Sequence, residues 1–118
     1  MNVRRIVPDL HTARIEESRD FYDEVLGMHA VMDMGWIVTL ASPADHTAQI
    51  SLMSGDATSP EPPDVTIEVA DVEVAYARAI RRGARIVHPL TNEAWGVRRF
   101  LVADPDGHVI NVMEHIRE

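Results

Sequence analysis

The feature that most constrains this chain is an internal repeat, because its second half follows the residue pattern of its first half. Segments Arg14–Gly27 and Asp71–Gly83 each carry an apolar residue followed by glutamate near the start, and each ends in glycine. Each half then closes on a similar apolar tail, Ile50–Met53 in the first and Ile110–Met113 in the second. Such a repeat predicts two equivalent modules packed about a pseudo-twofold axis, with a groove between them.

Composition places the chain among ordinary globular proteins. Its 118 residues are 46% hydrophobic and 25% charged, enough for one domain with a respectable core. No apolar run approaches the roughly 18 residues that a membrane helix needs, and the N-terminus lacks the apolar core of a signal peptide. We therefore expect a cytoplasmic protein that does not bind membranes.

Missing residue types exclude several kinds of chemistry. The sequence has no cysteine, which removes disulfides, thiolate metal ligands and cysteine nucleophiles. It also has no lysine, which removes Schiff-base catalysis through a side-chain amine. The net charge of −8 argues against a nucleic-acid partner, because such binding needs a basic surface.

Hydrophobic periodicity and turn residues predict the same strand–helix–strands order in each half. Module one is expected over about 1–54, a linker rich in proline over 55–63, and module two over 64–118. Strands are expected at 3–12, 28–33, 36–41, 48–53, 65–70, 84–88, 97–103 and 108–115, and helices at 14–26 and 72–82. Pro8 suggests that the first strand is an edge or bulged strand, because proline has no backbone donor. The expected class is α+β, with a curved mixed sheet that encloses a groove and helices outside.

Alternation within the strands predicts which side chains face the helices. In Val65–Val69 apolar residues alternate with polar ones, so one face packs on a helix and the other is wetter. In the two tails, Ile50 with Leu52 and Ile110 with Val112 are expected to pack on the helices. Ser51, Met53, Asn111 and Met113 then lie on the opposite face.

Three motifs give the chain its resemblance to a known family. They are Ile15, Phe21-Tyr22 and Leu26-Gly27 along the first helix, Trp95-Gly96 followed by Phe100, and the run Asp104–Ile110. With these motifs the chain resembles the vicinal oxygen chelate superfamily, the glyoxalase/bleomycin-resistance/dioxygenase group, over nearly its whole length. The resemblance implies two βαβββ modules, eight strands around a U-shaped groove, and a homodimer.

The resemblance also implies where a metal ion would bind. Metalloenzymes of the family use four side chains, and the matching positions here are Val7, Ser51, Asp64 and Asn111. Valine cannot bind a metal, serine and asparagine are weak neutral donors, and Asp64 alone is a competent anionic ligand. We therefore expect no metal and no other cofactor. In the alternative, a divalent metal such as Zn, Ni, Mn or Fe would need Asp64, His11, Glu68 or another residue to replace the missing ligands.

Ligand-binding candidates come from the wet face of the strands and from the two tryptophans. Trp36 and Trp95 can stack on flat or cationic ligands, or fill the core, and methionines give adaptable apolar lining. Asp9 and Glu68 can attract a cation, act as an acid–base pair, or simply be solvated. The full set of candidates is Asp9, His11, Trp36, Ser51, Met53, Asp64, Glu68, Trp95, Asn111 and Met113. Arg98 and Arg99 alternate along one strand, which leaves open which of them faces the groove.

The preferred hypothesis is a metal-independent small-molecule binder of the bleomycin-resistance type, which would confer antibiotic resistance by sequestration. The acidic candidates favour a bulky ligand that is cationic or carries an amine, and no catalytic residue is assigned. The alternative is a metal-dependent lyase, isomerase or dioxygenase acting on adjacent oxygens of a substrate. A third hypothesis is a regulatory or interaction module that kept the scaffold, because fold alone does not fix activity.

Overall fold

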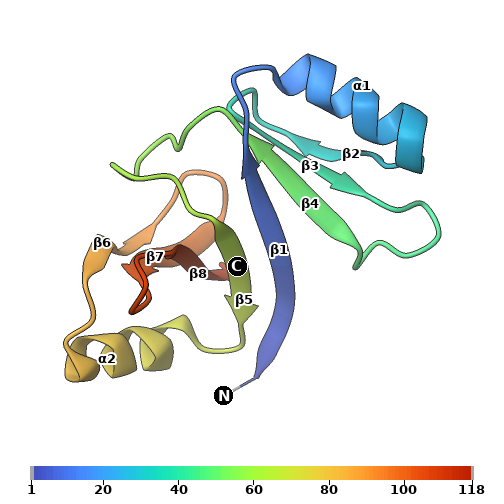
Figure 1. Ribbon diagram of the computed structural model, residues 1–118. Helices are drawn as coiled ribbons and strands as arrows, with labels where there is room; N and C mark the ends of the chain where they lie inside the picture. The colour runs from blue at the N-terminus through green and yellow to red at the C-terminus, as the bar shows by residue number, and fades with distance from the viewer. Residues whose placement is uncertain (1, 118) are drawn as a thin grey trace. The chain divides into compact units, whose positions relative to one another are not determined.

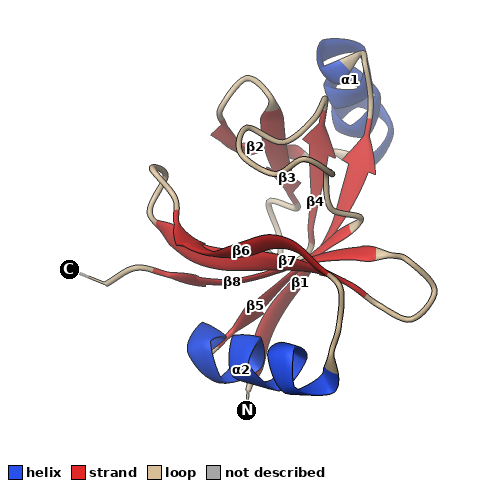
Figure 2. Ribbon diagram, turned by 90° about the vertical axis from the view of Figure 1, so that its left-hand side faces the viewer, coloured by secondary structure: helices blue, strands red, loops and turns tan. Residues whose placement is uncertain are grey.

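The computed structural model describes residues 2–117, and its elements follow the order βαβββ twice (Figure 1). The first half contains β1 (Val3–His11), α1 (Ile15–Leu26), β2 (His29–Asp33), β3 (Ile37–Ala41) and β4 (Gln49–Met53). The second contains β5 (Val65–Val69), α2 (Val72–Arg82), β6 (Ile86–Asn92), β7 (Val97–Ala103) and β8 (Val109–His115). Each half consists of one helix and a group of strands (Figure 2). The α+β class and the two βαβββ modules are confirmed.

Backbone contacts group the chain into two compact units. Residues Val7–Thr58 form the β1–β4 unit, and the chain up to Ile6 together with the chain from Ser59 onward forms the β5–β8 unit. The beginning of the chain joins the second unit through its backbone, where the Ala70 N–H donates to the Asn2 carbonyl at 2.9 Å. The expected organisation, one domain with module one over about 1–54, a linker over 55–63 and module two over 64–118, stays a prediction.

The β1–β4 unit has strand order β2-β3-β4-β1, with α1 against β2 and β4. β4 pairs antiparallel with β3 and parallel with β1. Its core consists of Val38, Leu40 and Leu52, with Ile15 and Tyr22 of α1 packed on it. Leu52 packs in the core beneath α1. Because side chains alternate along a strand, its two neighbours on β4 lie on the opposite face of the sheet, away from α1.

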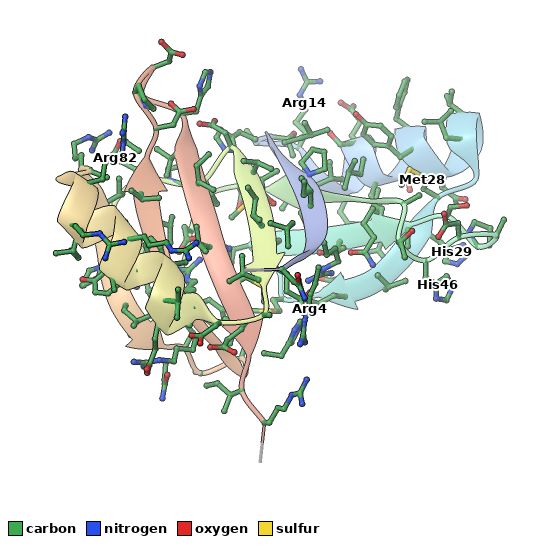
Figure 3. The ribbon with its side chains drawn as sticks, turned by 90° about the horizontal axis from the view of Figure 1, so that it is seen from below. Arg4, Arg14, Met28, His29, His46 and Arg82 are labelled. Carbon is green, nitrogen blue, oxygen red and sulfur yellow. The ribbon has the colours of Figure 1, made fainter. Side chains whose placement is uncertain are left out.

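The β5–β8 unit has strand order β5-β8-β7-β6, with β5 and β8 parallel. Helix α2 lies across β6, β7 and β8 (Figure 3), and Arg82 at its end points into solvent. The core consists of Val69, Val72 and Phe100, and the Tyr76 ring packs edge-on against Phe100 with centroids 4.9 Å apart. One face of this sheet is therefore closed by α2, and the opposite face carries Arg99, Leu101 and Met113, all of them buried.

Helix ends follow the local sequence signals. Both helices end at glycines in the left-handed conformation, Gly27 at φ 68° and Gly83 at φ 75°, as the C-cap position requires. At the start of α2 the Asp71 carboxylate accepts a hydrogen bond from the Val74 N–H at 3.2 Å, the usual arrangement of an N-cap. These caps explain why both helices were placed to within one residue from the sequence.

One strand was predicted wrongly. The strand expected at 84–88 is β6, which runs over Ile86–Asn92 and continues through Pro89. Proline has no backbone donor, and register shifts on both sides of His88 accommodate it within the strand. The other strands and helices agree with the prediction to within one residue at each end. Pro8 precedes the three registered pairs of β1 with β4, Asp9–His11 with Ser51–Met53, so it disturbs none of them.

Among residues 2–117, neither helix is both long enough and apolar enough to cross a bilayer.

Candidate functional site

The face of the β5–β8 unit opposite α2 brings several predicted residues into two adjacent rows. Strand register places Met113 of β8 between Arg99 of β7 and Glu68 of β5. In the next row, Asn111 of β8 lies beside Thr66 of β5. Because side chains alternate along each strand, one face of these three neighbouring strands carries the following polar or sulfur-containing side chains: Arg99, Met113, Glu68, Asn111 and Thr66.

A buried ion pair lies on this face of the sheet. The Arg99 Nε donates to Glu93 Oε2 at 2.7 Å, and their side chains are 3% and 4% exposed. His88 Nε2 lies 3.5 Å from the same Glu93 oxygen. The Arg99 guanidinium carbon lies 5.0 Å from the centre of the Trp95 ring, within the range of a cation–π contact. Moving a charge into the protein interior costs several kcal/mol for each ion, so a buried ion pair is weak evidence for stability. The cluster of Arg99, Glu93, His88 and Trp95 therefore suggests a role other than stabilising the fold.

A tight turn between β6 and β7 holds the acid and the indole in place. The Glu93 N–H donates to the Val97 carbonyl at 2.8 Å, and the Gly96 N–H donates to the Glu93 carbonyl at 3.1 Å. Gly96 has φ 87°, a conformation that a side chain would strain. Trp95 therefore projects from a turn whose backbone is fixed on both sides.

The structure resolves which of the two neighbouring arginines faces this surface. Arg98 points toward α2, where its Nη2 lies 3.1 Å from the Glu73 carboxylate. Arg99 lies on the opposite face, as alternation requires.

Two predicted carboxylates of this unit are already engaged. Glu68 accepts from Arg5 Nε at 3.0 Å and lies 3.2 Å from His115 Nδ1. Asp64 accepts from the Val109 N–H at 2.9 Å, so its side chain fixes the start of β8 next to β5. The charge on Glu68 is balanced by a cation, which weakens its attraction for a cationic ligand.

Asn111 presents one hydrogen-bonding atom without a partner. Its Nδ2 donates to Thr66 Oγ1 at 3.1 Å. Its Oδ1 is buried and accepts no hydrogen bond from the residues that the structure describes. A buried carbonyl oxygen costs free energy until a donor reaches it, so this atom is suited to accept an N–H or O–H group.

The β1–β4 unit carries the remaining candidates. Asp9 is 5% exposed and lies directly across from Ser51 in the parallel pair of β1 and β4. Ser51 Oγ and Thr39 Oγ1 share a hydrogen bond of 2.8 Å, and Met53 is fully buried. His11 is exposed and Trp36 is half-buried.

A sequence model of the Glyoxalase/Bleomycin resistance protein/Dioxygenase superfamily matches residues 5–112. The chain belongs to this superfamily. It is also similar to an uncharacterized protein from Mycobacterium tuberculosis, with 37% identity over 57 residues, 48% of this chain and 34% of that protein. The matched stretch is thus about a third of that relative's length.

Solved structures show the same fold. A superfamily member from Vibrio splendidus has a TM-score of 0.72 at 23% identity, over 96% of this chain and 99% of that one. Methylmalonyl-CoA epimerase from Mycobacterium tuberculosis gives 0.68 at 18% identity, over 98% and 88% of the two chains. A mutant homoprotocatechuate 2,3-dioxygenase from Brevibacterium fuscum gives 0.72 at 21% identity, over 98% of this chain and 33% of the enzyme. At these identities the likeness concerns the fold alone.

Members of the superfamily often hold a metal ion, but the matching residues here do not fit one. Val7 is a buried apolar side chain, 3% exposed. The Ser51 hydroxyl and the Asp64 carboxylate already hydrogen-bond within the protein, and Asn111 offers only a neutral amide oxygen, a weak metal ligand. Across residues 2–117, no group of three or more His, Cys, Asp or Glu side chains is arranged to hold a metal ion.

Sequence reasoning missed two members of the buried cluster and one neighbour. Glu93 and His88 were not singled out, nor was Arg5, which balances Glu68. A usable signal was present: Glu93 and Arg99 are opposite charges close on either side of the Trp95-Gly96 turn, in a hairpin that is otherwise mostly apolar.

Proposed function

We propose that this protein binds a small organic molecule without a metal ion, in the manner of the bleomycin-resistance branch of its superfamily. The residues at the family's metal-ligand positions carry this proposal. One of them, Val7, has no donor atom, and the carboxylate of another, Asp64, accepts a backbone hydrogen bond from Val109. Binding would be stoichiometric, and the ligand would leave unchanged.

Stacking and apolar contact supply the affinity in this proposal. Trp95 is half-buried on a turn fixed by backbone hydrogen bonds, and Met113, itself buried, lies on the same sheet. The Asn111 carbonyl oxygen supplies one directional contact for a ligand donor. Because Glu68 is neutralised by Arg5, a positive charge on the ligand is not required.

A thermal-shift screen of small organic molecules, run with and without EDTA, tests the proposal. A ligand present at 100 times its Kd adds about 2.7 kcal/mol of stability by mass action, which such a screen detects easily. We expect hits whose shifts are the same with and without the chelator. Shifts that vanish with EDTA and return with a divalent cation would favour the metal-dependent enzyme instead. A screen without hits would favour a scaffold that acts through other proteins.

The homodimer that the resemblance implies is part of the proposal. Light scattering coupled to size exclusion should give about twice the mass of 13.2 kDa. A monomer at micromolar concentration would remove the dimer from the proposal without affecting ligand binding.

A further inference from the structure

We infer that a cavity at the end of β5 and β8 binds a doubly charged oxyanion, a phosphate or a dicarboxylate, through Arg4 and Arg117. The inference goes beyond the proposed function, because it assigns a second ligand site on the β5–β8 unit. It does not require the proposed function to hold.

The cavity lies within the β5–β8 unit, where two parallel strands end. β5 and β8 run in the same direction, so they end on the same side of their sheet. The beginning of the chain joins them there, because the Ala70 N–H donates to the Asn2 carbonyl at 2.9 Å. The cavity has a volume of about 330 Å³, at the lower end of the range for small organic ligands. It is lined by Arg4, Glu68, Ala70, Glu114, His115 and Arg117.

Both carboxylates of the cavity already have partners within the protein. Glu68 accepts from Arg5 Nε at 3.0 Å and lies 3.2 Å from His115 Nδ1. Glu114 accepts from the N–H of Val72, the first residue of α2, at 3.2 Å. The partial positive charge at a helix N-terminus favours an acid in that place. The two acids are therefore held by other groups and leave the remaining cations of the cavity to a ligand.

Two arginines of the cavity keep their donors for a ligand. Arg4 projects from the start of β1 (Figure 3), and Arg117 follows the end of β8. Within residues 2–117 neither guanidinium takes part in an ion pair or a hydrogen bond. Arginine presents its donors in a planar fork that matches the paired oxygens of a carboxylate or a phosphate. Two such forks at one cavity favour a ligand that carries two negative charges.

The balance of charge and polarity narrows the ligand further. With Arg5 included, three arginines stand against two glutamates, so this cavity is positive in a chain whose net charge is −8. Of the six lining residues Ala70 alone is apolar, so the walls offer little to an apolar ligand. A small polar molecule with a phosphate or two carboxylates fits both properties.

Two-dimensional NMR of the whole chain, at constant ionic strength and mildly alkaline pH, tests this inference. The probes are inorganic phosphate and succinate, both doubly charged at that pH, and acetate, which carries one charge. We expect one or both dianions to shift the amide signals of Ala70, Glu114 and His115 with saturation, and to bind about tenfold more tightly than acetate. Tighter binding of phosphate would identify a phosphate ligand, and tighter binding of succinate a dicarboxylate; both support the inference. Absence of a saturable shift at tens of millimolar, equal affinity for acetate, or shifts confined to other parts of the chain would overturn it.

Paired variants separate a site from general attraction by charge. R4Q/R117Q removes both forks and should raise the Kd of the tighter dianion by about tenfold, because two charge-assisted contacts at an exposed site are lost. The matched control R81Q/R82Q removes two exposed arginines at the end of α2, changes the net charge equally, and should raise the Kd by less than about twofold. All four side chains are exposed, so both variants should fold, and their amide spectra check this directly. A Kd unchanged in R4Q/R117Q, or raised equally in the two variants, would contradict the inference. The ligand screen with EDTA decides the proposed function separately, so either can fail alone.

Discussion

Replacing Arg99 by methionine alone should destabilise the protein strongly. The substitution removes the cation whose Nε lies 2.7 Å from the Glu93 carboxylate, which is itself 4% exposed. Breaking one side of a buried ion pair costs about 3–5 kcal/mol, because the remaining charge is held away from water. Loss of the Trp95 contact adds about 0.5–2 kcal/mol. The sum is a large part of the 5–15 kcal/mol by which a domain is usually stable, so R99M should be close to unfolding at 37 °C.

The double variant E93Q/R99M should recover most of that loss. Neither partner keeps its charge, and an uncharged amide at position 93 costs less in the interior than a carboxylate that has lost its cation. Urea unfolding followed by circular dichroism measures both variants, and the control E61Q/R85M should leave the midpoint unchanged, since that pair is exposed. The reasoning fails if R99M costs less than about 1 kcal/mol, or if the double variant is as unstable as R99M.

Three further predictions concern the fold and the β7–β8 turn. Phe100→Ala should cost about 3–5 kcal/mol in urea unfolding, because Phe100 is 1% exposed at the centre of its core; a loss below 1 kcal/mol would mean that the core is loosely packed. Asp71→Ala should cost about 1 kcal/mol by the same assay, since it removes the side-chain cap on Val74, and an unchanged midpoint would show that water replaces the cap. The hydrogen bond that the His108 ring donates to the Asp104 carboxylate raises the pKa of His108 above its usual value, so the stabilisation from this pair is fully present below the usual histidine pKa and is lost as pH rises through the raised pKa. Proton NMR titration should show the raised pKa and its return to normal in Asp104→Asn; identical titrations of the two proteins would contradict this.

The repeat and the alternation of apolar residues predicted the fold well. Leu52 and Val112 pack on the helix side, and Ser51 and Met113 lie on the other face, as period-two patterning requires. These features depend on local sequence, since one face of each strand has to be apolar to pack on a helix.

Long-range pairing lay beyond sequence reasoning. Whether Arg98 or Arg99 lies on the face opposite α2 depends on how β7 pairs with β8 and on where α2 lies, and the sequence of β7 alone specifies neither. The Glu93 carboxylate is buried where the β6–β7 turn brings it to Arg99 of β7, a contact that residue type alone does not indicate. The extent of β6 was missed for a similar reason: its strand passes through Pro89 by register shifts that a single-strand pattern does not reveal.

Metal-binding calorimetry on the chelator-treated protein tests the central claim most directly. Val7 offers no ligand atom, Ser51 and Asp64 are hydrogen-bonded within the protein, and Asn111 offers a single neutral oxygen, so titration with Zn²⁺, Ni²⁺, Mn²⁺ or Fe²⁺ should show no saturable site tighter than about millimolar. One equivalent of any of these ions bound with micromolar affinity, and lost on Asp64→Ala substitution, would contradict the account and return the protein to the metalloenzymes of its superfamily.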